Sequence, residues 1–162
     1  MVGAPAVITC TLALLGRSPD SMPPITLLEA VPPHVSANAE AFVRMGEGKI
    51  YVITSAPAFR EARCWVPGSL VKLASVLVHE EWHIRHGGDE RRAYSAQLLT
   101  LVQLGARVDS PLYKSVVRAM ESVEAANRRV AVKISQPAAG LDTLIFENDQ
   151  ELEAPLLVSP RR

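Results

Sequence analysis

The spacing of hydrophobic residues along the chain changes at Gly68, from short β-type runs before it to a helical period after it. Upstream, the segments 25–28, 39–44 and 49–55 are predicted to be strands, and the last is the richest in β-branched and aromatic residues. A short glycine-containing turn, 45–48, separates the last two segments and predicts a hairpin. The first part of the chain therefore predicts a small β-sheet.

Helical periods predict four helices, most of which end at glycine, the residue best suited to the left-handed conformation that follows a helix. Gly16 ends the first helix, Gly87-Gly88 ends the second, and the third ends near Gly105. Pro111 suits the first position of the last helix. The predicted helices cover roughly residues 5–16, 68–86, 90–105 and 111–130. A short sheet packed on a helical half is the α+β class.

Composition limits the classes of protein and partner. A length of 162 residues predicts one domain, which we expect over 1–135, followed by a disordered acidic, proline-containing tail over 136–162. A net charge of zero argues against nucleic acid as a partner, because no overall positive field would attract it. Cys10 and Cys64 give no disulfide framework and are expected to be small buried apolar residues.

The apolar stretch 6–15 bears on localisation. It is too short to cross a bilayer as a helix, so no membrane span is expected. No Lys or Arg precedes Arg17, so the stretch also lacks the basic start of a secretory signal. A cytoplasmic protein is therefore expected, and a signal sequence removed ahead of this chain would change that expectation to a secreted one.

The strongest chemical signal is the sequence His79-Glu80-Glu81-Trp82-His83. Two histidines four residues apart project from one face of a helix, one turn from each other, and can bind the same metal ion. Glu80 lies beside that face and Glu81 on the far side, so Glu80 alone is placed to act on a metal-bound water. This is the physical content of the H-E-x-x-H pattern, and it predicts a zinc site with Glu80 as general base.

A catalytic zinc site needs a third protein ligand, and four residues are candidates. His86 shares the helical face but lies about 10 Å along the axis from His79, too far while the helix stays regular. Asp89 occupies the third-ligand position of metzincins, and Cys64 lies upstream of the motif as the cysteine ligand does in peptide deformylases. Glu90 opens the next helix directly after the glycine turn and is favoured, with Asp89 as the helix N-cap.

The region around these residues resembles the gluzincin class of metallopeptidases, and most closely the very small members called minigluzincins. In these proteins a helix bears H-E-x-x-H and the following helix supplies a glutamate ligand, often with alanine three residues later, as in Glu90 and Ala93. The six residues between His83 and Glu90 make this spacing shorter than in most gluzincins. The resemblance implies a zincin-like fold, a bound Zn²⁺, peptidase activity, and an edge strand before the metal helix, here 49–55.

The sequence thus predicts a zinc metallopeptidase that acts on a peptide or protein, with His79, His83 and Glu90 as metal ligands. Tyr94 is a second catalytic candidate, since its hydroxyl could stabilise an oxyanion. Two alternatives remain: a non-catalytic zinc-binding or interaction module, and a zinc hydrolase of a non-peptide substrate. Other residues with chemical potential are expected to have ordinary roles, namely Trp65 and Trp82 in the core or a wall and His34 in solvent.

Overall fold

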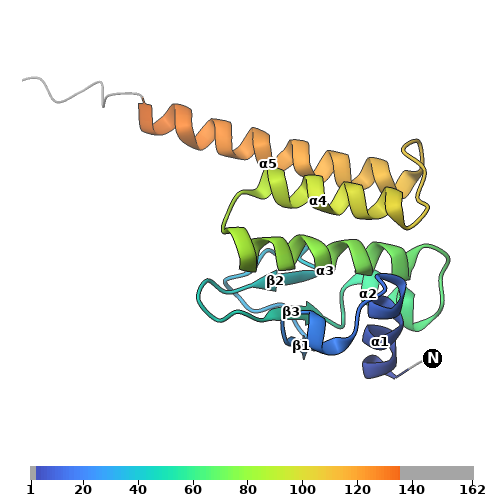
Figure 1. The fold of residues 1–162 in the computed structure, drawn as a ribbon. Helices are drawn as coiled ribbons and strands as arrows, with labels where there is room; N and C mark the ends of the chain where they lie inside the picture. The colour runs from blue at the N-terminus through green and yellow to red at the C-terminus, as the bar shows by residue number, and fades with distance from the viewer. Residues whose placement is uncertain (1–2, 136–162) are drawn as a thin grey trace, which may run out of the picture.

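A computed structural model describes residues 3–135 of the chain, and their side chains as far as Arg129. A small sheet lies on one side of a long central helix and two further helices lie on the other, as Figure 1 shows. This arrangement confirms the α+β class. The elements in order are α1 (Ala4–Leu14), a 3₁₀ turn η1 (Pro19–Ser21), β1 (Ile25–Leu28), β2 (Ala41–Val43), β3 (Ile50–Ile53), α2 (Pro57–Arg63), α3 (Ser69–His86), α4 (Glu90–Gln103) and α5 (Pro111–Ser135).

The sheet has the order β1-β3-β2, with β3 parallel to β1 and antiparallel to β2. The predicted hairpin is confirmed by the pairing of Ala41 with Val52 and of Val43 with Ile50. The expectation that segment 49–55 forms an edge strand is wrong, because β3 is paired on both sides and all its residues are buried. Its strong β character reflects that central position, and β2 is the edge strand next to the helical half.

Helix α3 is the centre of the fold, since α1, α2, the sheet and α4 all pack against it. Leu73 and Leu77 are fully buried and join α3 to a core shared with Ile50 and Val52 of the sheet and Phe59 of α2. Burial of these side chains on several sides holds the helix in place, so groups on it are fixed relative to the sheet.

The helical half follows the predicted helices closely. Asp89 caps α4 by accepting a hydrogen bond from the Arg92 backbone N–H at 3.1 Å, and Ser110 caps α5 through the Tyr113 N–H at 3.2 Å. Both contacts satisfy backbone donors that the first turn of a helix leaves free. Helix α5 lies along α4 and continues past the predicted end at residue 130.

Helix α2 and its C-terminal turn differ from the sequence prediction, which assigned no helix there. The Trp65 N–H bonds to the Ala62 carbonyl and the Val66 N–H to the Glu61 carbonyl, which is the Schellman pattern of a helix end. Trp65 occupies the left-handed position of that motif, with φ of 56°. Its side chain is 55% exposed, so of the two expected positions, core or wall, the core is wrong.

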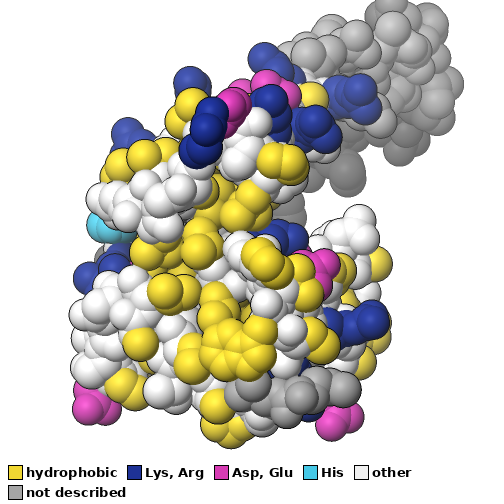
Figure 2. All heavy atoms as spheres, turned by 90° about the vertical axis from the view of Figure 1, so that its right-hand side faces the viewer, with side chains coloured by type: hydrophobic (Ala, Val, Ile, Leu, Met, Phe, Trp, Pro, Cys, Tyr) yellow, Lys and Arg dark blue, Asp and Glu magenta, His cyan; other side chains and the backbone are white. Residues whose placement is uncertain are grey.

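Neither cysteine is buried: Cys64 is exposed and Cys10 half-buried, so the expectation for both is wrong. Figure 2 views the right-hand side of Figure 1 and shows hydrophobic side chains gathered over that face. The exposed large hydrophobic residues of the chain include Leu14, Val66 and Leu99.

In the part of the chain that the structure describes, no helix has the length and apolar character needed to cross a membrane. The predicted tail, 136–162, lies outside the described residues, as does the boundary set at 135/136 between domain and tail.

Candidate metal centre

Helix α3 presents His79 and His83 on one face, one turn apart and both buried. Their Nε2 atoms lie 3.1 Å from each other, and the two rings meet edge to face with centroids 4.8 Å apart. The i, i+4 spacing of a regular helix brings the rings together, as the sequence predicts. Two imidazole nitrogens therefore point at one common position.

Glu90 reaches the same position from the first turn of α4. Its carboxylate oxygens lie 3.5 Å from His79 Nε2 and 3.4 Å from His83 Nε2. The chain reverses between the helices at Gly87, whose φ of 90° and ψ of −158° are values that residues with a Cβ rarely adopt. The predicted approach of Glu90 to both imidazoles is thus observed.

The electrostatics of the group follow from this contact. Hydrogen bonds from His79 and His83 hold the pKa of the Glu90 carboxyl at about 2, well below its usual value. The same contact raises the pKa of His83, because the carboxylate favours the protonated imidazole. A cation at this position would replace those protons, since metal binding requires neutral imidazoles and an ionised carboxylate.

The three side chains fit a metal ion. One ligand atom from each lies within 4.8 Å of the others. The two Nε2 atoms are 3.1 Å apart, Glu90 Oε1 lies 3.4 Å from His83 Nε2, and Glu90 Oε2 lies 3.5 Å from His79 Nε2. A tetrahedral ion with bonds of about 2.0–2.2 Å separates its ligand atoms by roughly 3.3–3.5 Å. His79, His83 and Glu90 could therefore bind a metal ion with little rearrangement.

His83 is oriented by the backbone at the end of α3. Its Nδ1 lies 2.8 Å from the Gly87 carbonyl oxygen. A carbonyl only accepts, so Nδ1 carries a hydrogen, and once the imidazole is neutral the lone pair of Nε2 faces the proposed metal position. His79 lacks a matching contact: its Nδ1 is buried and has no hydrogen-bond partner among the described protein groups.

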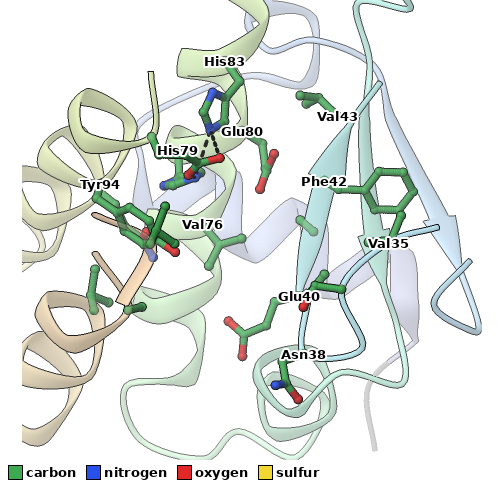
Figure 3. Close-up of a pocket in the computed structure, with 18 of the residues that line it drawn as sticks. Val35, Asn38, Glu40, Phe42, Val43, Val76, His79, Glu80, His83 and Tyr94 are labelled. Atoms are coloured by element: carbon green, nitrogen blue, oxygen red, sulfur yellow. Dashed lines mark hydrogen bonds and ion pairs between the residues drawn. The ribbon is translucent and has the colours of Figure 1, made fainter. Parts of the chain in front are cut away.

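Glu80 lies beside the triad and outside it, between α3 and β2 (Figure 3). Burial is the main reason that the pKa of its carboxyl is raised; Glu90 raises it further, while His79 and His83 act in the opposite direction. A buried carboxyl is costly to fold unless it is paired, and none of the described side chains donates a hydrogen bond to this one. Such groups are enriched where proton transfer occurs.

Tyr94 lies one turn into α4, on the side of His79 opposite to Glu80 (Figure 3). Its ring meets the His79 ring edge to face, with centroids 4.6 Å apart, and lines the same cleft. Burial, with smaller effects of Glu90 and Glu80, raises the pKa of the hydroxyl. The Tyr94 hydroxyl therefore stays protonated at neutral pH and remains a hydrogen-bond donor.

Glu81 faces away from the cleft, as its helical angle predicts. It is 3% exposed and pairs with Arg17, three residues after the end of α1, and with Arg85, whose Nη2 lies 2.5 Å from Glu81 Oε1. This carboxylate therefore joins the back of the metal helix to the N-terminal segment, a role that the sequence alone does not reveal.

The other candidate ligands lie elsewhere. His86 contacts the Trp82 ring, with centroids 5.0 Å apart and the planes tilted by 41°, and neither residue lines the cleft around the triad. Asp89 is exposed and serves as the helix cap, while Cys64 and His34 are exposed and outside the group. Only Glu90, among the candidates for a third ligand, joins the two histidines in this structure.

A cleft of about 750 Å³ surrounds the group, with the triad and Glu80 on its floor. Figure 3 shows β2 on one side of the floor and Tyr94 on the other. Sequence reasoning missed two parts of these walls: the edge strand β2, and residues of α5. A Lys72–Glu40 ion pair, 2.5 Å between Nζ and Oε1, also lines the cleft and joins α3 to the start of β2.

Comparison of the chain with protein families, curated proteins and solved structures gave no match. The structure therefore shows a His79, His83 and Glu90 group that could hold a metal ion, and assigns no family.

Proposed function

We propose that this chain is a zinc-dependent metallopeptidase with His79, His83 and Glu90 as metal ligands, Glu80 as general base and Tyr94 as a hydrogen-bond donor in the transition state. Two imidazoles and one carboxylate are a donor set that catalytic zinc sites use while keeping a fourth position open. This donor set, on adjoining turns of α3 and α4, supports zinc as the metal.

The proposal depends chiefly on the position of Glu80, buried beside the triad. A metal site that only stabilises a fold has no need of a base, and commonly fills its fourth position with protein. Here a buried carboxyl with a raised pKa lies next to the triad and opens on the same cleft. That combination favours catalysis over a purely structural or interaction role.

A bound zinc ion would supply Lewis acidity, lowering the pKa of a coordinated water and polarising a substrate carbonyl. Glu80 would accept the proton of the attacking water and later deliver it to the leaving amine. A carboxyl suits both steps when its pKa is raised toward neutral, as burial does for Glu80.

Tyr94 would act on the opposite side of the reacting carbonyl from Glu80. Its protonated hydroxyl can donate a hydrogen bond to the oxygen on which negative charge develops. The edge-to-face contact with His79 limits the orientations of the Tyr94 ring and keeps it against the cleft.

The edge strand β2 supports a peptide as the substrate. One side of β2 pairs with β3, and β2 also lines the cleft that holds the triad. An extended chain could add to the unpaired side through backbone hydrogen bonds, which provide affinity with little demand on sequence. A small non-peptide amide would make no use of this edge.

Metal analysis of the purified protein, together with cleavage of a broad peptide library, tests the proposal. We expect about one zinc per chain and cleavage that is lost on chelation and in Glu80→Gln. Bound zinc with no hydrolysis of any amide would identify a metal-binding module instead. Hydrolysis limited to small non-peptide amides would identify the other alternative.

A further inference from the structure

We propose that α5 is the specificity wall of the cleft, and that the peptide bound there is extended and packs an apolar side chain against Val116, Ala119 and Val123. The inference rests on the proposed peptidase function and names the class of substrate that this function would select.

The cleft has two unlike walls. Glu40 and β2 form one wall, which offers backbone groups, and α5 contributes side chains to the wall that faces it across Val76 and His79 of α3 (Figure 3). A peptide paired with β2 directs alternate side chains to opposite faces of the extended sheet. Side chains on the helical side of such a peptide would therefore meet α5.

The α5 residues that line the cleft include three spaced as i, i+3 and i+7: Val116, Ala119 and Val123. This spacing places them on one side of the helix, as an apolar stripe about 10 Å long, with Val116 (5% exposed) at its buried end and Ala119 and Val123 half-buried. An extended peptide advances about 3.3 Å per residue, so the stripe spans roughly three residues of a bound chain. Val76, on the floor, extends the apolar surface toward His79.

The charges in the cleft disfavour an acidic side chain. Of the described residues that line it, Lys72 alone is Lys or Arg, and its ammonium is paired with Glu40 at 2.5 Å. Glu80 and Glu90 add two carboxyl groups near the scissile position. An Asp or Glu beside that position would lose hydration without gaining a partner, whereas an apolar side chain gains from burial.

The rim agrees with this chemistry. Met45, in the turn between β2 and β3, lines the cleft and is 79% exposed. A methionine side chain adapts its shape to different apolar partners, so it can fold over a bound side chain of variable size. Met45 and the α5 stripe thus line the same cleft as the triad. Under the proposed function, the occupant of that cleft is a peptide whose amide bond lies next to His79 and His83.

Binding is measured with metal-loaded Glu80→Gln, so that no cleavage interferes, using two short blocked peptides that differ only in a central Leu or Asp. We expect the Leu peptide to bind at least about 10-fold more tightly, since filling an apolar pocket is worth that factor or more. Equal affinities, preference for Asp, or no binding of either peptide would overturn the inference.

Substitutions on α5 test the wall itself. In the same background, Ala119→Lys should reduce or reverse the preference for Leu, because its ammonium can pair with Asp. Ser122→Lys is the matched control, since Ser122 is exposed on α5 and does not line the cleft. Equal effects of the two lysines would sink the proposal. If Ala119→Lys fails to fold, Ala119→Leu should instead favour a central Ala over Leu at least several-fold, and an unchanged preference would count against the wall.

Hydrolysis by the unmodified protein separates this inference from the proposed function. Cleavage of both peptides at equal rates would leave a peptidase without an α5 wall. Tight, Leu-selective binding with no cleavage of the bound peptide would leave the wall and remove the peptidase.

Discussion

His83 Nδ1 lies 2.8 Å from the carbonyl oxygen of Gly87, the residue that ends the metal helix and reverses the chain. One glycine thus does two things: its backbone angles allow the turn that brings Glu90 back to α3, and its carbonyl orients a proposed ligand. A hydrogen bond to one ring nitrogen of a histidine ligand fixes which nitrogen is free to bind the metal.

Gly87→Ala should therefore weaken metal binding without touching any ligand. A Cβ at φ of 90° is strained, which should cost about 1–3 kcal/mol of stability, and displacement of the carbonyl should reduce metal affinity about 10–100-fold. Gly88→Ala is the control, because Gly88 has no positive φ and a Cβ there meets nothing within 4 Å. Zinc titration with a competing chelator measures both, and equal affinities would contradict the role given to Gly87.

Replacing Glu80 and its neighbour separates chemistry from stability. Glu80→Gln should retain zinc and lose hydrolysis. It should also raise the melting temperature of the metal-free protein at neutral pH, because the folded protein disfavours the ionised carboxyl once the pH exceeds about 4.5. Substantial loss of zinc, or full turnover, would remove Glu80 as the base.

Glu81→Gln should lower the stability of the protein, whereas Glu80→Gln should raise it. The substitution removes the charge of a buried carboxylate that pairs with the partly exposed Arg17 and Arg85, so we expect a loss of about 1–3 kcal/mol of stability, with zinc binding retained. Denaturant unfolding of the two variants in parallel tests this contrast. A stable Glu81→Gln protein would show that the ion pairs contribute little.

Glu90→Ala should reduce zinc affinity by more than about 100-fold. Substituting a residue that only hydrogen-bonds to a ligand costs up to about 100-fold, and loss of a ligand itself should cost more. Asp89→Ala removes the cap of α4 and should cost about 1 kcal/mol of stability while zinc affinity stays close to that of the unmodified protein. Isothermal titration with zinc distinguishes the two. Should Asp89→Ala or Cys64→Ala lose zinc while Glu90→Ala keeps it, another ligand set takes the place of this one.

The pH dependence of the metal-free protein should report the Glu90 contact with the imidazoles. The pKa of Glu90 is lowered to about 2, so its contribution is present above about pH 4.5 and lost as the pH falls toward 2. The pKa of His83 is raised, so its contribution is present below about pH 6.5 and lost as the pH rises through the raised value. Thermal melts in chelator should show that Glu90→Gln destabilises most between these limits. A difference that does not change from about pH 3 to 9 would argue against the contact.

The edge strand β2 gives a prediction about the ligand. If a peptide pairs with β2, N-methylation of the amides that face the strand should weaken binding to metal-loaded Glu80→Gln about 5- to 10-fold each, the value of one lost hydrogen bond. Methylation of the alternate amides, which point away from β2, is the internal control. A fluorescence competition assay over both sets measures the pattern, and identical losses at all positions would exclude strand addition.

The geometry of the proposed ligands could be anticipated because it depends on local sequence. The i, i+4 period sets His79 beside His83, and the glycine turn makes Glu90 the first helical residue on return. Strand order could not be anticipated, since it depends on the distant pairing of Ile25 with Ile50. A strand such as 49–55 has the same composition whether it lies at an edge or at the centre. The pairing of β3 on both sides and the burial of Ile50–Ile53 reveal the latter.

Other differences have similarly specific causes. Trp65 reads as a core residue by type, yet the helix-end motif of α2 places it in a left-handed position that faces solvent. The contribution of α5 to the cleft could not be predicted either. It depends on how the α4–α5 connection folds, and Val116 and Val123 have residue types that suit a cleft wall and a packed helix face equally.

Every side chain proposed here to bind metal or to transfer a proton lies between His79 and Tyr94, within a single helical hairpin. Closing so short a segment costs little chain entropy, so the hairpin can form before β1 pairs with β3. Metal could then bind while the sheet is still unformed and stabilise an early folding species as well as the finished protein. Refolding of this chain should accordingly be faster with zinc present, with the gain abolished in Glu90→Ala and retained in Glu80→Gln.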